Sequence, residues 1–263
     1  MVIFDHLGRK LSFPNTPKRI VSLVPSQTEL LVDLGLIDSL VGITKFCIHP
    51  ENLRKQKLVV GGTKSVHFDK IAELNPDIIL CNKEENTKEM VAELEKIAPV
   101  HVSEVSGVAQ SLQLITEYGK LFNAEKEAEF FVSKIESKLQ ILSEKIQNKK
   151  WESCVYLIWK DPYMAAGSDT FINELLQLNK LENKIVSTRY PEVSLEQLKE
   201  YAPDMVLLSS EPFPFNDDHV VQLRILGLNA IKVDGEYFSW YGSRLEKAID
   251  YFIYSVAQFS TSG

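Results

Sequence analysis

The chain has 263 residues, of which 44% are hydrophobic and 25% are charged, a composition typical of a folded globular protein and unlike that of disordered, collagen-like or coiled-coil chains. At roughly 150 residues per domain, this length predicts about two domains, each able to fold without a disulfide or a structural metal. The formal charge of −7 and the lack of basic runs interleaved with aromatic residues argue against a nucleic acid as partner.

The cysteines and the apolar segments bear on the cellular setting. Cys47, Cys81 and Cys154 are an odd number without a C-x-x-C spacing, which argues against a disulfide framework and favours a reducing compartment. The first ten residues contain charges and lack the apolar core of a signal peptide. The longest apolar runs have the length of strands, far below the ~20 residues that cross a bilayer, so no membrane span is predicted.

Buried strands and helices alternate in the N-terminal part. Residues 19–25 have the pattern of a buried strand that ends at a proline. Ser26 and Glu29 then have the spacing of a capping box, which predicts a helix that ends near Gly35. Strands separated by helices of this length indicate a parallel sheet. The further strands are predicted at residues 40–44, 77–81 and 100–102, and the further helices at 68–74 and 86–97.

Residues 109–148 lack strand signals and form a different kind of segment. Apolar side chains recur every three or four residues between Ala128 and Ile146, which predicts a long amphipathic helix. The part at 124–147 contains about 24 residues and corresponds to a rod of roughly 36 Å. Such a helix can span two lobes or lie on the surface of a single domain.

The alternation of strands and helices restarts after residue 150. Strands are predicted at 153–159, 205–209 and 230–233, and helices at 170–178, 195–201 and 243–258. Residues 195–207 repeat the pattern of residues 68–80 at a constant offset of 127 positions, which brings Pro203-Asp204 into register with Pro76-Asp77. The repeat predicts an N-terminal α/β lobe at 1–108, a helical linker at 109–149 and a C-terminal α/β lobe at 150–263.

Several ordered motifs together point to a protein family. They are the segment Arg19-Ile-Val-Ser-Leu-Val-Pro-Ser-Gln-Thr-Glu-Leu30, the two helices before the Pro-Asp pairs, and the segment Pro162-Tyr-Met-Ala-Ala-Gly-Ser-Asp-Thr-Phe-Ile172. With them, roughly residues 19–258 resemble the helical-backbone (class III) substrate-binding proteins of ABC importers, most of all the periplasmic cobalamin-binding group. The resemblance implies two Rossmann-like α/β lobes with parallel sheets, joined by one long backbone helix, with a ligand cleft between the lobes.

The ligands of this family are bulky metal complexes such as cobalamin, haem or iron chelates, and a pocket for them needs aromatic faces and a few polar groups. Loops that follow predicted strands of the second lobe are rich in aromatic residues, and we expect them to leave one edge of the sheet. Each aromatic side chain could instead belong to a core. The candidates for ligand binding are Gln27, Lys45, Lys83, Trp159, Tyr163, Arg189, Phe213, Phe215, Phe238, Trp240, Tyr241 and Arg244.

Two further pairs of residues are candidates for partner docking and for metal binding. The resemblance implies that one acidic residue on each lobe docks to arginines of the membrane permease, and Asp69 and Glu196 match those positions. Both could instead be solvated acids favoured by a helix dipole. Cys47 and His49 could bind a metal, although most metal sites need three or four ligands. His49 could also be an axial ligand to the metal of a bound complex.

We therefore predict a monomeric binding protein rather than an enzyme, which needs no cofactor and captures a metal chelate, foremost cobalamin, for an ABC importer. The alternatives are a haem or ferric-siderophore receptor, and a cytosolic enzyme or salvage protein with the same bilobal fold. The sequence contains no nucleophile elbow, P-loop, zinc-helix or dinucleotide-binding pattern. The family implies the periplasm or cell envelope if a signal peptide was removed, and the cytoplasm is the alternative.

Overall fold

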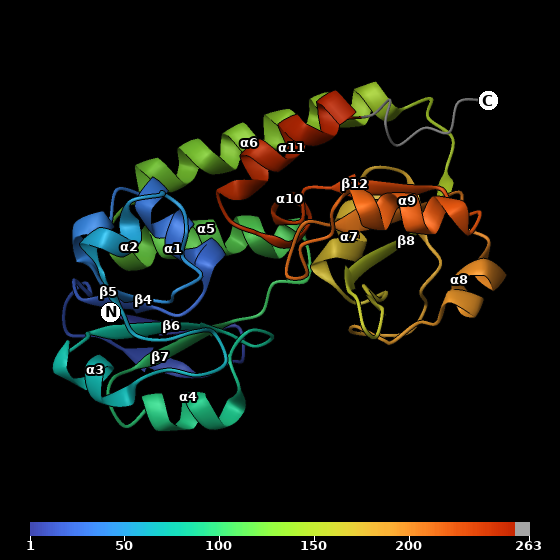
Figure 1. Cartoon of the computed structure of the whole chain (residues 1–263). Helices are drawn as coiled ribbons and strands as arrows, with labels where there is room; N and C mark the ends of the chain where they lie inside the picture. The colour runs from blue at the N-terminus through green and yellow to red at the C-terminus, as the bar shows by residue number, and fades with distance from the viewer. Residues whose placement is uncertain (256–263) are drawn as a thin grey trace. The chain divides into compact units, whose positions relative to one another are not determined.

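The computed structural model describes residues 1–255 and divides the chain into two compact units (Figure 1). Each unit contains one largely parallel sheet and its helices, so the predicted α/β class with two parallel sheets is confirmed. Unit 1 consists of Met1–Val105, Ala109–Lys134 and Tyr241–Arg244, and unit 2 of Ser106–Val108, Ile135–Trp240 and the residues from Leu245 onward.

Unit 1 is built around a five-stranded sheet. Its helices and strands are β1 (Val2–Phe4), β2 (Lys10–Ser12), β3 (Ile20–Ser22), α1 (Pro25–Asp33), η1 (Ile37–Ser39), β4 (Leu40–Ile43), α2 (Leu53–Gln56), β5 (Leu58–Val59), α3 (Phe68–Glu73), β6 (Ile78–Asn82), α4 (Lys88–Leu94), β7 (Val100–Ser103) and α5 (Val108–Phe122). The sheet has the order β5-β4-β3-β6-β7, with all neighbours parallel. Counted along the chain, this is the order 3-2-1-4-5 of nucleotide-binding folds, so all five carboxyl ends share one edge. β1 and β2 form a separate antiparallel hairpin.

Helices cover both faces of this sheet, with α1 and α2 on one side and α3 and α4 on the other (Figure 1). Ile71 of α3 and Leu94 of α4 share a core with the strand residues Ile79 and Val100. Because both faces are covered, every residue of β6 is buried, which explains its nearly continuous apolar sequence.

The start of α1 differs from the prediction. The helix begins at Pro25, and Val24 is its N-cap without a side-chain hydrogen bond, so the predicted capping box of Ser26 and Glu29 is wrong. Proline suits the first helical position because it has no N–H that would need a partner there. Gly35 follows the helix with a φ of 77°, the left-handed conformation that ends many helices.

The segment after β7 forms two helices rather than one. α5 ends at Phe122, Asn123 adopts a φ of 59°, and α6 (Glu125–Ile146) begins two residues later. Asparagine is one of the few residues that tolerate this left-handed conformation. α6 has 22 residues, which confirms the long helix predicted at 124–147, and its residues up to Lys134 belong to unit 1 while the following ones belong to unit 2.

Unit 2 has a parallel sheet of order β10-β8-β11-β12, with β9 antiparallel to β8. Helices α8 and α9 contribute Leu198 and Leu223 to the core on one face. The predicted closing helix is α11, which is described to Ser255, and residues 256–258 of that prediction lie outside the described part. The elements are β8 (Glu152–Trp159), β9 (Met164–Ala165), α7 (Phe171–Leu178), β10 (Leu181–Asn183), α8 (Leu195–Tyr201), β11 (Met205–Ser209), α9 (Asp217–Ile225), β12 (Ala230–Val233), α10 (Glu236–Ser239) and α11 (Arg244–Ser255).

The sequence repeat corresponds to the same structural unit in both halves. In unit 1, α3 leads into β6, and in unit 2, α8 leads into β11. The aspartate of each Pro-Asp pair accepts hydrogen bonds from the start of the neighbouring strand: Asp77 from the N–H groups of Lys18 and Arg19 at 2.8 and 2.9 Å, and Asp204 from the N–H of Ser153 at 2.6 Å. The repeated aspartates therefore hold the amino ends of two adjacent strands together.

Candidate functional site

Three aromatic loops leave the carboxyl edge of the sheet in unit 2, as the sequence predicts. They follow β8, β11 and β12, which are parallel neighbours. Trp159, at the end of β8, is 40% exposed and packs edge-to-face against Phe213, with ring centroids 5.7 Å apart. Phe213 in turn packs against Phe215 at 4.8 Å, and its N–H donates to the carbonyl of Ile158. This edge thus presents an accessible aromatic surface anchored on a buried aromatic side chain.

A half-buried carboxyl group, Glu211, fixes the loop that follows β12. Its Oε1 accepts hydrogen bonds from Nε1 of Trp240 at 2.8 Å and from Oγ of Ser239 at 2.9 Å. Burial raises the pKa of Glu211, and the nearby charge of Glu236 adds to the effect. A Cβ on Gly235 would lie 2.7 Å from Cγ of Glu211, so only glycine allows this close approach. Trp240 is therefore held in place by its indole N–H.

The other residues predicted in unit 2 differ in exposure. Phe238 is fully buried and packs between Tyr156 and Phe252, at 5.2 and 4.9 Å. Tyr163 is half-buried against the core of unit 2. Arg189 is exposed, and its backbone N–H donates to Asp169 at 2.5 Å. Of the predicted aromatic residues of this unit, Trp159, Tyr163 and Phe213 keep accessible surface, whereas Phe215, Phe238 and Trp240 are buried.

A cavity of about 650 Å³ lies at the carboxyl ends of β4 and β5 in unit 1. Lys45, a predicted site residue, lines it together with Lys64, His67 and Lys70, which the sequence reasoning missed. The ammonium of Lys45 lies 5.0 Å from the ring centre of the exposed Phe46, which also lines the cavity. The cavity has the size of a small-molecule site, for which roughly 300–1,000 Å³ is typical.

A tight loop at residues 61–66 forms part of this cavity. Gly61 adopts a φ of 137°, and a Cβ there would lie 2.6 Å from the carbonyl oxygen of Ser65, so glycine is required. The carbonyl of Gly61 accepts a hydrogen bond from the N–H of Lys45 at 2.8 Å, and the N–H of Gly62 donates to the carbonyl of Ser65 at 2.7 Å. These bonds join the loop to the end of β4.

Gln27 and Tyr241, two predicted ligand-binding residues, lie in a buried hydrogen-bond network of unit 1. Nε2 of Gln27 donates to Oγ of Ser103 at 2.6 Å and to the hydroxyl of Tyr241 at 2.9 Å, while the hydroxyl of Tyr118 donates to Oε1 at 2.7 Å. Burial raises the pKa of Tyr118 and of Tyr241, so both phenols stay neutral. This network lies at the carboxyl ends of β3, β6 and β7, beside the point between β3 and β6 at which the strand order reverses. Open α/β sheets favour a ligand crevice at such a point.

The other charged candidates of unit 1 have partners in the same unit. Nε of Arg244 donates to Oε2 of Glu29 at 2.7 Å, and both side chains are buried. Lys83 is exposed and forms an ion pair with Glu104. Arg244 therefore has a structural contact, and Lys83 is neutralised by a carboxylate.

The two acids predicted to dock to a permease occupy equivalent places. Asp69 lies in the first turn of α3 and Glu196 in the first turn of α8, and both are exposed. The pKa of Glu196 is lowered because its carboxylate accepts hydrogen bonds from its own backbone N–H and from the hydroxyl of Ser194.

Among the described residues, Cys47 and His49 do not form part of a larger group of potential metal ligands. Cys47 is buried, and its Sγ lies 3.1 Å from Oγ1 of Thr28 and 3.2 Å from Oγ1 of Thr44. Burial raises the pKa of this thiol, which disfavours the thiolate that binds metals. His49 is half-buried. Within residues 1–255, no three His, Cys, Asp or Glu side chains are arranged to hold a metal ion, and all three cysteines are free and buried.

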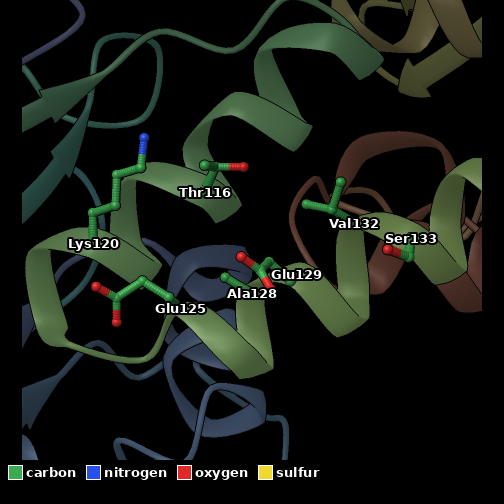
Figure 2. Close-up of a pocket in the computed structure, with 7 residues that line it drawn as sticks. All are labelled: Thr116, Lys120, Glu125, Ala128, Glu129, Val132 and Ser133. Atoms are coloured by element: carbon green, nitrogen blue, oxygen red, sulfur yellow. The ribbon is translucent and has the colours of Figure 1, made fainter.

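A second, smaller cavity of about 130 Å³ lies between α5 and α6 in unit 1 (Figure 2). Thr116 and Lys120 of α5 and Glu129 and Val132 of α6 line it, and the close packing of the two helices rests on Gly119. This cavity is far from the size that a metal chelate needs.

The periplasmic binding protein family matches residues 20–234, and the chain belongs to this family. Among similar sequences are YvrC, an ABC transporter substrate-binding lipoprotein of Bacillus subtilis, and the vitamin B12-binding protein of Vibrio campbellii. The first is 28% identical over 216 residues, 79% of this chain and 68% of the relative; the second is 24% identical over 205 residues, 75% and 73%.

Solved structures share the fold. The periplasmic vitamin B12-binding protein BtuF of Vibrio cholerae superposes with a TM-score of 0.81 at 18% identity, covering 93% of this chain and 98% of that one. The periplasmic haem-binding protein RhuT of Roseiflexus sp. RS-1 gives a TM-score of 0.77 at 17% identity, covering 92% and 98%. In the part of the chain that the structure describes, no helix is both long and apolar enough to cross a membrane.

Proposed function

We propose that this protein is the substrate-binding component of an ABC importer and that its ligand is a metal chelate, foremost cobalamin. Its membership of the periplasmic binding protein family supports this proposal, as do the vitamin B12-binding and ABC transporter relatives. A haem or ferric-siderophore ligand is the alternative within the same class. The protein binds its ligand without catalysing a reaction.

The observation that carries this proposal is the accessible aromatic surface of unit 2. Trp159 and Phe213 lie at the carboxyl edge of a parallel sheet, the edge at which open α/β sheets bind ligands. Flat aromatic rings suit the face of a macrocycle or an aromatic chelator. We propose that the chelate packs on Trp159.

Calorimetric titration of the purified protein with cyanocobalamin, haemin and a ferric tris-catecholate tests this function. We expect one of them to bind with micromolar or tighter affinity. Trp159→Ala should weaken the affinity for that chelate about tenfold or more, because truncation of a central aromatic contact typically costs ~2 kcal/mol.

Trp151→Ala is the matched control. Trp151 is 58% exposed and lies just before β8, at the opposite end of the strand that Trp159 terminates. The Trp151→Ala variant should bind the chelate as tightly as the wild type does. If none of the three chelates binds, the proposed function is wrong, and a cytosolic enzyme or salvage protein with the same fold becomes the better hypothesis.

The permease contact and the compartment are part of the same proposal. We propose that Asp69 and Glu196 dock to the importer and that the protein works in the cell envelope, as the lipoprotein and periplasmic relatives suggest. Asp69→Arg or Glu196→Arg should then abolish delivery of the ligand to a reconstituted importer while leaving its binding intact. Glu73→Arg, at the other end of α3, should leave delivery unchanged.

A further inference from the structure

The cavity of about 650 Å³ in unit 1 has a positively charged lining. Lys45, Lys64 and Lys70 line it, and among the described residues no carboxylate does. We propose that it binds an anionic group carried on the periphery of the metal chelate, through these three ammonium groups. This inference rests on the proposed function and adds a requirement for the ligand, namely a negatively charged arm.

The cavity is positively charged, whereas the whole chain is negatively charged. The protein has a formal net charge of −7, yet three lysines share one cavity. Lys83, by contrast, forms an ion pair with Glu104. Within residues 1–255, none of the three cavity lysines forms an ion pair with a carboxylate. Like charges gathered in a concave surface repel one another and focus a positive potential, which an anion relieves.

The contacts of the lysines hold them at the cavity without neutralising them. The ammonium of Lys64 donates to the carbonyl oxygen of Glu84, which satisfies one of its three donors and leaves its charge in place. The ammonium of Lys45 lies over the ring of Phe46, so a cation–π interaction stabilises its charge. Lys70 extends from the first turns of α3. The lysines thus come from three successive segments of unit 1.

The backbone leaves room for the anion between these side chains. A Cβ on Gly62 would lie 3.3 Å from Cε2 of Phe46 and 3.6 Å from Cε of Lys45, so any larger side chain there would project toward the cationic wall. The volume is sufficient for a propionate, a phosphodiester or a catecholate together with part of the ring system that carries it. Lysine, a compact point charge, suits all three of these anions.

Matched pairs of chelates distinguish the sources of the negative charge. Cyanocobalamin carries a phosphodiester arm that dicyanocobinamide lacks. Haemin carries two propionates that its dimethyl ester masks, and a ferric tris-catecholate is anionic where a ferric tris-hydroxamate is neutral. We expect the wild-type protein to prefer the anionic member of the pair that it binds by about tenfold or more, with a preference that weakens as salt is added.

The decisive variant replaces the three lysines together, as Lys45→Gln/Lys64→Gln/Lys70→Gln. Its affinity for the anionic chelate should fall about tenfold or more, and its affinity for the neutral member should change less than about twofold. The control Lys10→Gln/Lys18→Gln/Lys88→Gln removes the same charge from exposed positions of unit 1 and should bind like the wild type. Gly62→Leu should weaken binding without changing charge, because it fills the cavity.

The outcomes separate the two proposals. If no chelate binds the folded wild-type protein, the proposed function fails and the inference falls with it. If a chelate binds but the lysine variant and its control bind it equally well, or if the neutral member of the pair binds as tightly as the anionic one, the function stands and the anionic arm is refuted. Far-ultraviolet circular dichroism of each variant confirms that it is folded.

Discussion

Gln27 offers a direct test of the buried network in unit 1. Gln27→Leu keeps the volume of the side chain but removes the acceptor of the Tyr118 hydroxyl and the donor to Ser103 and Tyr241. The hydroxyl of the fully buried Tyr118 would lose its partner, which costs ~1–3 kcal/mol, and the weakened bonds of the other two groups add ~1 kcal/mol. We expect the free energy of unfolding to fall by about 2–4 kcal/mol.

Urea unfolding followed by circular dichroism measures this loss. Because all three tryptophans belong to unit 2, their fluorescence reports in the same titration on the unit without the substitution. Adding Tyr118→Phe to Gln27→Leu removes the orphaned hydroxyl and should recover ~1–3 kcal/mol. A single variant within about 0.5 kcal/mol of the wild type, or a double variant no more stable than the single one, would refute the network as a source of stability.

Three further predictions concern buried groups. Burial lowers the pKa of His101 from 6.5 to about 4, so the folded protein prefers the neutral imidazole. The stability that this preference provides above pH 6.5 is lost as the pH falls toward 4. Between about pH 7 and pH 4.5, the melting temperature of His101→Phe should therefore fall less than that of the wild type. Glu29→Gln leaves the buried Arg244 guanidinium without its carboxylate and should cost ~3–5 kcal/mol in urea unfolding, most of which Arg244→Met should restore in the double variant. Burial raises the pKa of every cysteine thiol, so Ellman's reagent should find no reactive thiol in the native protein and three after unfolding, and rapid reaction of the native protein would contradict the buried placement of Cys47, Cys81 and Cys154.

The regular elements with strong apolar patterns could be predicted from the sequence. The helix at Leu195–Tyr201 and the strands at Met205–Ser209 and Ala230–Val233 have the predicted bounds. They are buried on defined faces, so hydrophobic periodicity reports them directly. α9 was missed because Val221 and Ile225 are 54% and 79% exposed, which blurs its apolar stripe.

Short elements and helix starts depend on contacts that a local pattern does not contain. The hairpin of β1 and β2 and the two-residue strand β5 are too short to show a periodicity. Ser26 and Glu29 have the spacing of a capping box, but the helix begins one residue earlier, at Pro25, whose ring fixes the backbone of the first turn. Glu29 then became available for Arg244, a residue 215 positions away.

The candidate site could be predicted as a set of loops but not side chain by side chain. Parallel strands place their following loops at one edge, which is why the three aromatic loops of unit 2 were found. Whether an aromatic residue in such a loop turns outward, as Trp159 does, or inward, as Phe238 does, depends on tertiary packing. Lys64 and Lys70 were missed because they do not directly follow a strand, although Gly61-Gly62 marks a tight turn beside them.

Hydrogen–deuterium exchange with and without bound chelate shows which segments of the protein the ligand contacts. The experiment uses whichever of cyanocobalamin, haemin and ferric tris-catecholate binds most tightly, at saturation. We expect slower exchange in peptides that cover residues 159–163 and 211–215 of unit 2 and residues 44–46 and 61–66 of unit 1. Protection confined to other segments, such as the helices around the smaller cavity at 116–133, would contradict the proposed contacts of the chelate with these segments.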